Sequence, residues 1–148
     1  MRFTTKTEYG LVCLVYMARH IDQITTVKEI ATQESFSLTY LQQIFHVLCE
    51  AGIVKGHHGR QGGYSLARSA SGITLKEIVE ALEGATFEVF CEPEIRKDIV
   101  CTHFSLCGMK HLWQKTKDLL DHFFGSVTLE TLSQGEGDVK HHFAKAAG

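Results

Sequence analysis

The sequence predicts a mainly α-helical fold with a small β-hairpin, in which a winged helix-turn-helix precedes a long C-terminal helix. Three observations predict it: apolar residues recur at helical spacing in several segments, a short break joins two of these segments, and a glycine-rich hairpin follows directly. The 148 residues, 44% of them hydrophobic, suffice for one compact domain with a sizeable core.

The first three helices are expected over residues 8–20, after Thr25 or Thr26, and after Ser37. The Thr26 and Ser37 hydroxyls suit helix starts because they accept hydrogen bonds from free backbone N–H groups, and Gly52 suits a helix end. The third helix carries hydrogen-bonding side chains at its start and off its apolar stripe: Ser37, Thr39, Tyr40, Gln42, Gln43 and His46. Such side chains contact base edges and phosphates in DNA-binding proteins. An ordinary solvated helix face is the alternative.

Residues 53–68 are expected to form the hairpin, with a basic, glycine-rich tip. A long cation on a slim backbone is what contact with a DNA minor groove requires. The candidate DNA contacts outside the third helix are Arg2, Lys28, His58 and Arg60. The charge distribution permits this interface, since residues 1–70 hold seven Lys/Arg against five Asp/Glu, whereas residues 71–148 hold eight against twelve.

Three of the five cysteines lie in a short segment, as Cys91, Cys101 and Cys107. Nine and then five residues separate them, and the only proline of the chain, Pro93, discourages a continuous helix there. Clustered thiols in a reducing compartment are metal ligands or redox sensors more often than structural bridges. Cys13 and Cys49 fall among aliphatic residues and are expected to be structural.

A fourth helix is expected over residues 73–83, with Thr74 as its cap, and a long helix from Cys107 to about residue 124. The long helix has a wide apolar stripe, which predicts dimerisation with a second copy of the chain. We therefore expect a DNA-binding domain over 1–84, a cysteine loop over 85–108, a dimerisation region over 109–132 and a flexible tail over 133–148.

The sequence resembles the bacterial winged-helix regulators that carry iron–sulfur clusters, such as IscR, NsrR and RirA. Four pieces carry the resemblance in this order: M-R-F-T-T-K-T-E-Y-G at the start, S-L-T-Y-L-Q-Q-I-F in the third helix, H-G-R-Q-G-G-Y in the hairpin, and three cysteines ahead of a long helix. The resemblance covers residues 1–132. It implies a homodimer that binds a palindromic double-stranded DNA operator, with an iron–sulfur cluster on Cys91, Cys101 and Cys107 that tunes DNA binding.

The resemblance leaves the fourth cluster ligand open. NsrR-like members have an acid at the position of Glu8 that ligates the cluster from the partner subunit, which makes Glu8 a candidate here. The IscR pattern has a histidine three residues after the last cysteine, where this chain has Lys110; His111 and His103 are therefore rival candidates. The hairpin also has His58 where many members have arginine, which predicts a weaker, pH-dependent contact.

The expected function is a regulator of transcription whose cluster senses iron, nitric oxide or redox state. Two alternatives remain: a zinc-stabilised module and a thiol–disulfide switch. The sequence contains neither a nucleophile–base pattern nor a phosphate loop, so it is not expected to be an enzyme. A chain without a signal peptide or an apolar run near the ~20 residues that span a bilayer is expected to be cytoplasmic, with no membrane partner.

Overall fold

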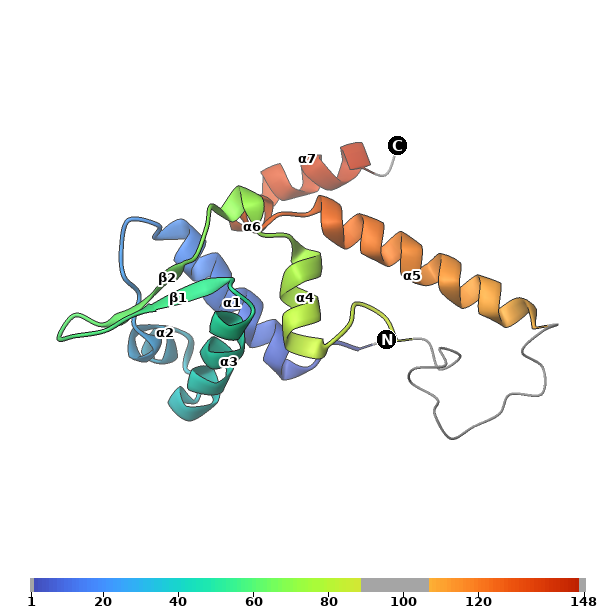
Figure 1. The fold of residues 1–148 in the computed structure, drawn as a ribbon. Helices are drawn as coiled ribbons and strands as arrows, with labels where there is room; N and C mark the ends of the chain where they lie inside the picture. Colours follow the sequence, from blue (N-terminus) through green and yellow to red (C-terminus); the bar gives the residue numbers. More distant parts are fainter. Residues whose placement is uncertain (1, 89–106, 147–148) are drawn as a thin grey trace, which may run out of the picture.

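The computed structural model describes residues 2–88 and 107–146. Helices and one two-stranded hairpin make up this part of the chain (Figure 1). The elements in order are α1 (Thr5–Arg19), α2 (Val27–Glu34), α3 (Leu38–Glu50), β1 (Val54–His57), β2 (Gly63–Leu66), the 3₁₀ turn η1 (Ala70–Gly72), α4 (Leu75–Glu83), α5 (Gly108–Ser126), α6 (Leu129–Ser133) and α7 (Glu136–Ala146). This confirms the predicted mainly α-helical class with one hairpin.

The core lies where α1, α3 and α4 pack against one another. Leu14, Ile44 and Phe45 are fully buried there, with Leu82 of α4 almost so. Gly10 lets α1 approach α4, since a Cβ at this position would lie 2.5 Å from Leu82 Cδ1. This packing joins α3, the second helix of the helix-turn-helix, to α1.

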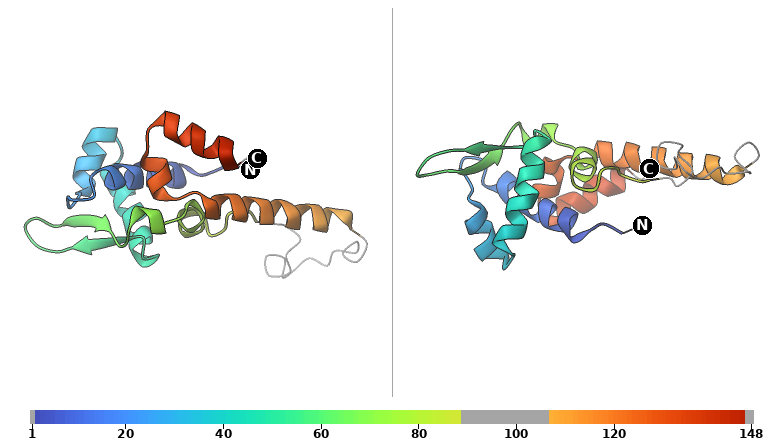
Figure 2. Two further views of the ribbon diagram at one scale, coloured as in Figure 1. Left: turned by 90° about the horizontal axis from the view of Figure 1, so that it is seen from above. Right: turned by 60° about the horizontal axis from the view of Figure 1, so that its bottom comes forward.

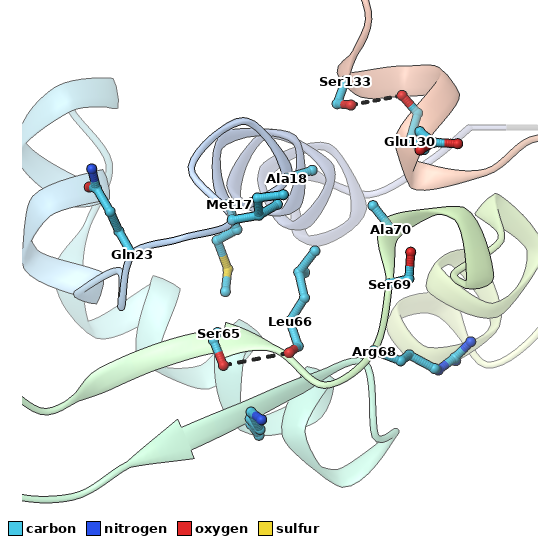
Figure 3. Close-up of a pocket in the computed structure, with 12 residues that line it drawn as sticks. Met17, Ala18, Gln23, Ser65, Leu66, Arg68, Ser69, Ala70, Glu130 and Ser133 are labelled. Carbon is cyan, nitrogen blue, oxygen red and sulfur yellow. Dashed lines mark hydrogen bonds between the residues drawn. The ribbon is translucent and has the colours of Figure 1, made fainter.

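The hairpin is antiparallel and gains a third strand-like partner from the segment before α2. Within β1 and β2, Lys55 pairs with Ser65 and His57 with Gly63. The Thr25 and Tyr64 backbones exchange two hydrogen bonds of 2.9 and 2.8 Å. At the hairpin root, the Met17 side chain of α1 and the Leu66 side chain of β2 point toward each other (Figure 3). The wing is therefore attached to the core at two places.

The C-terminal helices are joined to the N-terminal domain through a short backbone bridge. The Leu75 N–H donates to the Val127 carbonyl at 2.8 Å, and the Leu129 N–H donates to the Ile73 carbonyl at 2.8 Å. From this bridge α5 projects away from the hairpin, α2 and α3 (Figures 1 and 2). Among the described residues no helix has the length and apolarity to cross a membrane.

Local sequence signals placed the helix ends well. Thr26 and Ser37 accept hydrogen bonds from the Glu29 and Tyr40 backbones, and Thr74 forms a capping box with Glu77. The expected long helix is present as α5, and a further short helix, α6, follows it.

The tail differs from the expectation. Residues 133–148 were expected to be flexible, but Glu136–Ala146 form α7. Lys140 pairs with Glu136 one turn earlier at 2.5 Å, and the Phe143 ring packs on Phe123 of α5 with centroids 5.8 Å apart. This aromatic contact with a distant helix gives α7 an anchor that the polar tail sequence alone did not indicate.

Candidate nucleic-acid interface and metal site

The solvent-facing side of α3 carries most of the predicted DNA contacts. Thr39, Gln42, Gln43 and His46 are exposed, whereas the opposite side of the helix is fully buried through Leu41, Ile44, Phe45 and Leu48. Ser37 is the N-cap of the helix. The structure thus brings these predicted residues together on one face, beside Lys6 of α1, which borders the same hollow.

Tyr40 is placed differently from its neighbours. Its side chain is half-buried, and its ring meets the Tyr9 ring edge-on at 5.9 Å. Tyr9 in turn stacks on Phe36 with ring centroids 3.7 Å apart. Tyr40 therefore lies at the border of the exposed face, where its packing fixes the start of α3 relative to α1.

The wing presents its basic tip to solvent. His58 and Arg60 are exposed, and Gly59 has a φ of 112°, a conformation that favours glycine. A Cβ on Gly62 would lie 2.7 Å from the His57 carbonyl, so the tip backbone is too tight for a side chain there. The glycines predicted to make a slim tip are required by its geometry.

The two other predicted DNA contacts are far apart in the fold. Lys28 is exposed in the first turn of α2, at the same end of the molecule as α3 and the wing (Figure 1). Arg2 is exposed before α1 and borders a hollow with Glu83 and Glu88. Arg2 therefore lies next to carboxylates and not beside the other predicted DNA contacts.

Of the predicted metal ligands, the structure describes Cys107, Glu8 and His111; Cys91, Cys101 and His103 lie outside the described residues. Cys107 is the half-buried N-cap of α5, and His111 is exposed one turn later. Within residues 2–88 and 107–146, no three side chains of metal-binding type converge on a point.

Glu8 is exposed in the first turn of α1. Its carboxylate has no hydrogen-bond or ion-pair partner among the described residues of the chain. It is therefore free to contact a ligand or a second subunit. Cys13 is the opposite case: its thiol is fully buried, and burial raises its pKa to about 12. Cys49 is half-buried, and desolvation also raises the pKa of its thiol. The expectation that these two thiols are structural fits their surroundings.

A carboxylate on α4 holds the first turn of α1, next to Glu8. Glu83 Oε1 accepts hydrogen bonds from the Thr4 backbone N–H at 2.8 Å, the Thr4 hydroxyl at 2.7 Å and the Thr7 hydroxyl at 2.5 Å. Desolvation by itself would raise the pKa of this carboxyl, but the bonds from Thr7 and Thr4 outweigh it and lower the pKa. Glu83 thereby caps α1 from another helix.

Both ends of the cysteine segment lie against α5. The Thr86 hydroxyl donates to Asp121, which also pairs with Lys117 at 3.2 Å. The Phe87 ring lies 6.2 Å from Trp113, and Cys107 begins α5 itself. The described residues on the two sides of residues 89–106 therefore both adjoin α5.

One side of α5 remains apolar and exposed. Four side chains of this α5 stripe are at least 40% exposed: Met109, Leu112, Leu119 and Phe123. With Thr116 they follow alternating steps of three and four residues, the spacing of a coiled-coil seam. This agrees with the apolar stripe predicted from the sequence.

Sequence reasoning missed Glu83, Thr86 and Asp121, because their partners are distant in the chain. It also missed Lys6, because helical spacing within α1 gives no sign that this residue lies beside the exposed face of α3. Leu38, in the first turn of α3, is 41% exposed and was not among the predicted DNA contacts.

The helix-turn-helix, the wing and the polar α3 face define a winged-helix DNA-binding protein. The family model described as "Rrf2: Iron-dependent Transcriptional regulator" matches residues 3–135. The chain belongs to this family and is a DNA-binding transcriptional regulator. Its relatives are named as regulators, which confirms the prediction that it is not an enzyme.

Three relatives illustrate the similarity. Protein rrf2 of Nitratidesulfovibrio vulgaris is 30% identical over 89% of this chain and 87% of its own. The solved structure of T. potens IscR has a TM-score of 0.68 at 30% identity and covers 89% of this chain and 86% of its own. An oxidized form of Staphylococcus aureus CymR has a TM-score of 0.70 at 28% identity, over 91% of this chain and 98% of its own.

Proposed function

We propose that the chain is a cytoplasmic homodimer whose affinity for its operator is controlled by an iron–sulfur cluster bound by Cys91, Cys101 and Cys107. The observation that carries the proposal is the position of Cys107 at the start of α5, with the other end of the cysteine segment held on α5 through Thr86 and Phe87. A ligand of this segment is thereby joined to the helix that carries the exposed apolar stripe. The "Iron-dependent" description of the family supports the same assignment.

The donor set fits such a cluster. Three cysteine thiolates are typical ligands of iron–sulfur clusters, and a fourth, non-thiolate ligand tunes the potential and lability. Glu8 is the fourth ligand we favour, supplied by the partner subunit, because its carboxylate is exposed and has no partner among the described residues. His111 and His103 are the rivals.

The proposed dimer forms through the α5 stripe of two copies. Burial of Met109, Leu112, Leu119 and Phe123 against a second α5 would remove exposed apolar side chains from water. A ligand shared by the cysteine segment of one subunit and α1 of the other would then fix the distance between the two α3 helices. Two such helices must enter successive major grooves about one helical turn apart, so a small shift changes operator affinity.

The ligand assignment is tested on anaerobically purified protein by absorption and circular dichroism of the cluster. Glu8→Ala is expected to change the spectrum and speed the loss of cluster, while Glu34→Ala, an exposed carboxylate on α2, leaves both unchanged. An unchanged spectrum in Glu8→Ala removes Glu8 from the ligand set, and His111→Ala then becomes the next variant.

A thiol–disulfide switch is the second candidate, favoured by the similarity to CymR, which has been solved in an oxidized form. The cysteines proposed for it are Cys91, Cys101 and Cys107; Cys13 is fully buried. Metal analysis separates the candidates: iron and sulfide in the anaerobic protein support the cluster, stoichiometric zinc supports a zinc site, and metal-free protein supports the thiol switch.

A further inference from the structure

The exposed side of α3 has a composition that restricts which bases it can read. Five side chains make up this reading face: Leu38, Thr39, Gln42, Gln43 and His46, all exposed. At about 100° per residue they span roughly 140° of the helix, opposite the buried stripe. The N-terminal part of a recognition helix supplies the base contacts in helix-turn-helix proteins, and four of the five residues lie in the first two turns.

No lysine or arginine occurs anywhere in α3, whose sequence is LTYLQQIFHVLCE. Guanine is read most often by a bidentate Arg or Lys at O6 and N7, so the helix lacks the usual guanine contact. Gln side chains instead form bidentate pairs with adenine at N6 and N7, and methyl-bearing side chains contact the thymine methyl group. Gln42 and Gln43 supply two carboxamides, while Leu38 and Thr39 supply methyl groups.

A purely solvated face would have a different composition. The solvent-facing sides of α4 and α7 carry charged pairs one turn apart, Lys76 with Glu80 at 3.7 Å and Lys140 with Glu136 at 2.5 Å. On the reading face, His46 lies 3.5 Å from Glu50 at the C-terminal end, but no charged pair occurs between Leu38 and Gln43, where 41% of a leucine is exposed instead. Neither glutamine carboxamide is hydrogen-bonded within the described residues, so both are free to bind bases.

The wing favours the same type of DNA by a separate mechanism. Arg60 is exposed in a tip where Gly59 has a φ of 112° and Gly62 has no room for a Cβ. Narrow minor grooves, which are typical of A-tracts, have an enhanced negative potential that attracts an inserted arginine. The helix and the wing thus favour adenine–thymine pairs in different grooves.

We propose that the operator of this regulator has half-sites dominated by A·T pairs, read in the major groove by Gln42, Gln43 and Leu38, with an A-tract minor groove under Arg60. The inference rests on the DNA-binding function of the chain. It does not require the cluster to control binding.

The test is selection of binding sites from a random duplex library by the full-length protein, performed with cluster-loaded and cluster-free preparations. We expect A·T pairs at the enriched half-site positions in whichever state binds. Enrichment of guanine–cytosine half-sites, or of no sequence in either state, overturns the proposal. Specific binding that is equal in both states would refute cluster control and leave the inference standing.

Two substitutions that are expected to change the base preference test which residues contact the bases. Gln42→Arg or Gln43→Arg is expected to change one preferred adenine to guanine, by roughly 5- to 150-fold in relative affinity. Gln33→Arg is the matched control. It adds the same charge on α2, where Gln33 borders a surface hollow with residues of α1 and α6 and not the reading face of α3. It is expected to leave the base preference unchanged, and a similar change of preference in the control would contradict the assignment.

Modified bases test the thymine contact. Replacing the half-site thymines by deoxyuridine removes only their methyl groups and is expected to weaken binding several-fold. Leu38→Ala should weaken binding to the normal operator and abolish the sensitivity to deoxyuridine. If Leu38→Ala keeps the full sensitivity, Leu38 does not contact thymine.

Discussion

The contact between Glu83 and the start of α1 is expected to be a major determinant of stability. One carboxylate oxygen accepts three hydrogen bonds of 2.5–2.8 Å from Thr4 and Thr7. In Glu83→Ala the fully buried Thr7 hydroxyl loses this acceptor, which costs about 1–3 kcal/mol. The loss of the cap on α1 adds about 1 kcal/mol. We therefore expect the free energy of unfolding to fall by about 2–4 kcal/mol.

A double-mutant cycle isolates this contact. Thr7→Val keeps the shape of the side chain and is expected to cost about 1 kcal/mol by itself. The double variant should lose at least about 1 kcal/mol less stability than the sum of the two single losses, because that sum counts the Thr7–Glu83 contact twice. The control pair is Thr7→Val with Glu80→Ala, a carboxylate of the same helix that pairs with Lys76 at 3.7 Å.

The assay is urea unfolding followed by circular dichroism at one fixed protein concentration, since dimerisation makes apparent stability concentration-dependent. The control pair should be additive within about 0.5 kcal/mol. If Thr7→Val and Glu83→Ala are equally additive, the two side chains are not coupled, and the reasoning is refuted.

Four further outcomes are expected. Because folding lowers the pKa of Glu83, the stability that its carboxylate adds is present above about pH 4.5 and is lost as the pH falls through the lowered pKa. The free energies of unfolding of wild type and Glu83→Gln should therefore converge at acidic pH. A constant difference between them down to pH 2 would contradict this linkage. Leu119→Glu places a charge in the α5 stripe and should give a monomer in sedimentation experiments; a dimer as tight as wild type would exclude this seam. Gly63→Ala puts a Cβ 2.6 Å from the Thr25 carbonyl, so it should displace the wing and weaken operator binding at least 10-fold, measured by fluorescence anisotropy, whereas Gly72→Ala, with open space around it, should not. Cys13 should resist alkylation at pH 8 in the native protein and react only after unfolding, as detected by mass spectrometry; native labelling would contradict its burial.

Signals that act within a few residues allowed the sequence to predict much of the fold. Thr26, Ser37 and Thr74 cap the expected helices, and Gly52 and Gly84 end them with φ of 69° and 94°. Each of these features depends on hydrogen bonds or backbone conformations that are local in the chain. The order of these elements, with the hairpin behind α3, then indicated the winged helix.

The contacts that link the site to the rest of the fold could not be predicted in this way. Thr7 and Glu83 are 76 residues apart, and Thr86 and Asp121 are 35 residues apart. No periodicity in the sequence distinguishes Glu83 from Glu80, which faces solvent in an ordinary ion pair. The same holds for α7, whose Phe143 meets Phe123 only after the chain has folded back on α5.

Part of the candidate site could be recognised from residue types alone. Gln42 and Gln43 were expected on the outer side of α3 because the apolar stripe left no other place for them, and both are exposed. Tyr40 satisfied the same criterion, yet its ring is half-buried against Tyr9. Helical spacing assigns a side chain to a side of its helix, but neighbouring helices decide how far the covered area extends.

Operator binding by a single anaerobic preparation, measured before and after removal of its cluster, tests cluster control most directly. Fluorescence anisotropy at fixed salt gives the two dissociation constants, and sedimentation confirms that both samples remain dimeric. Cluster control predicts that the constants differ at least 10-fold, and that the difference disappears when Cys107→Ala protein undergoes the same treatment. Equal constants in the wild-type protein would contradict the proposed switch.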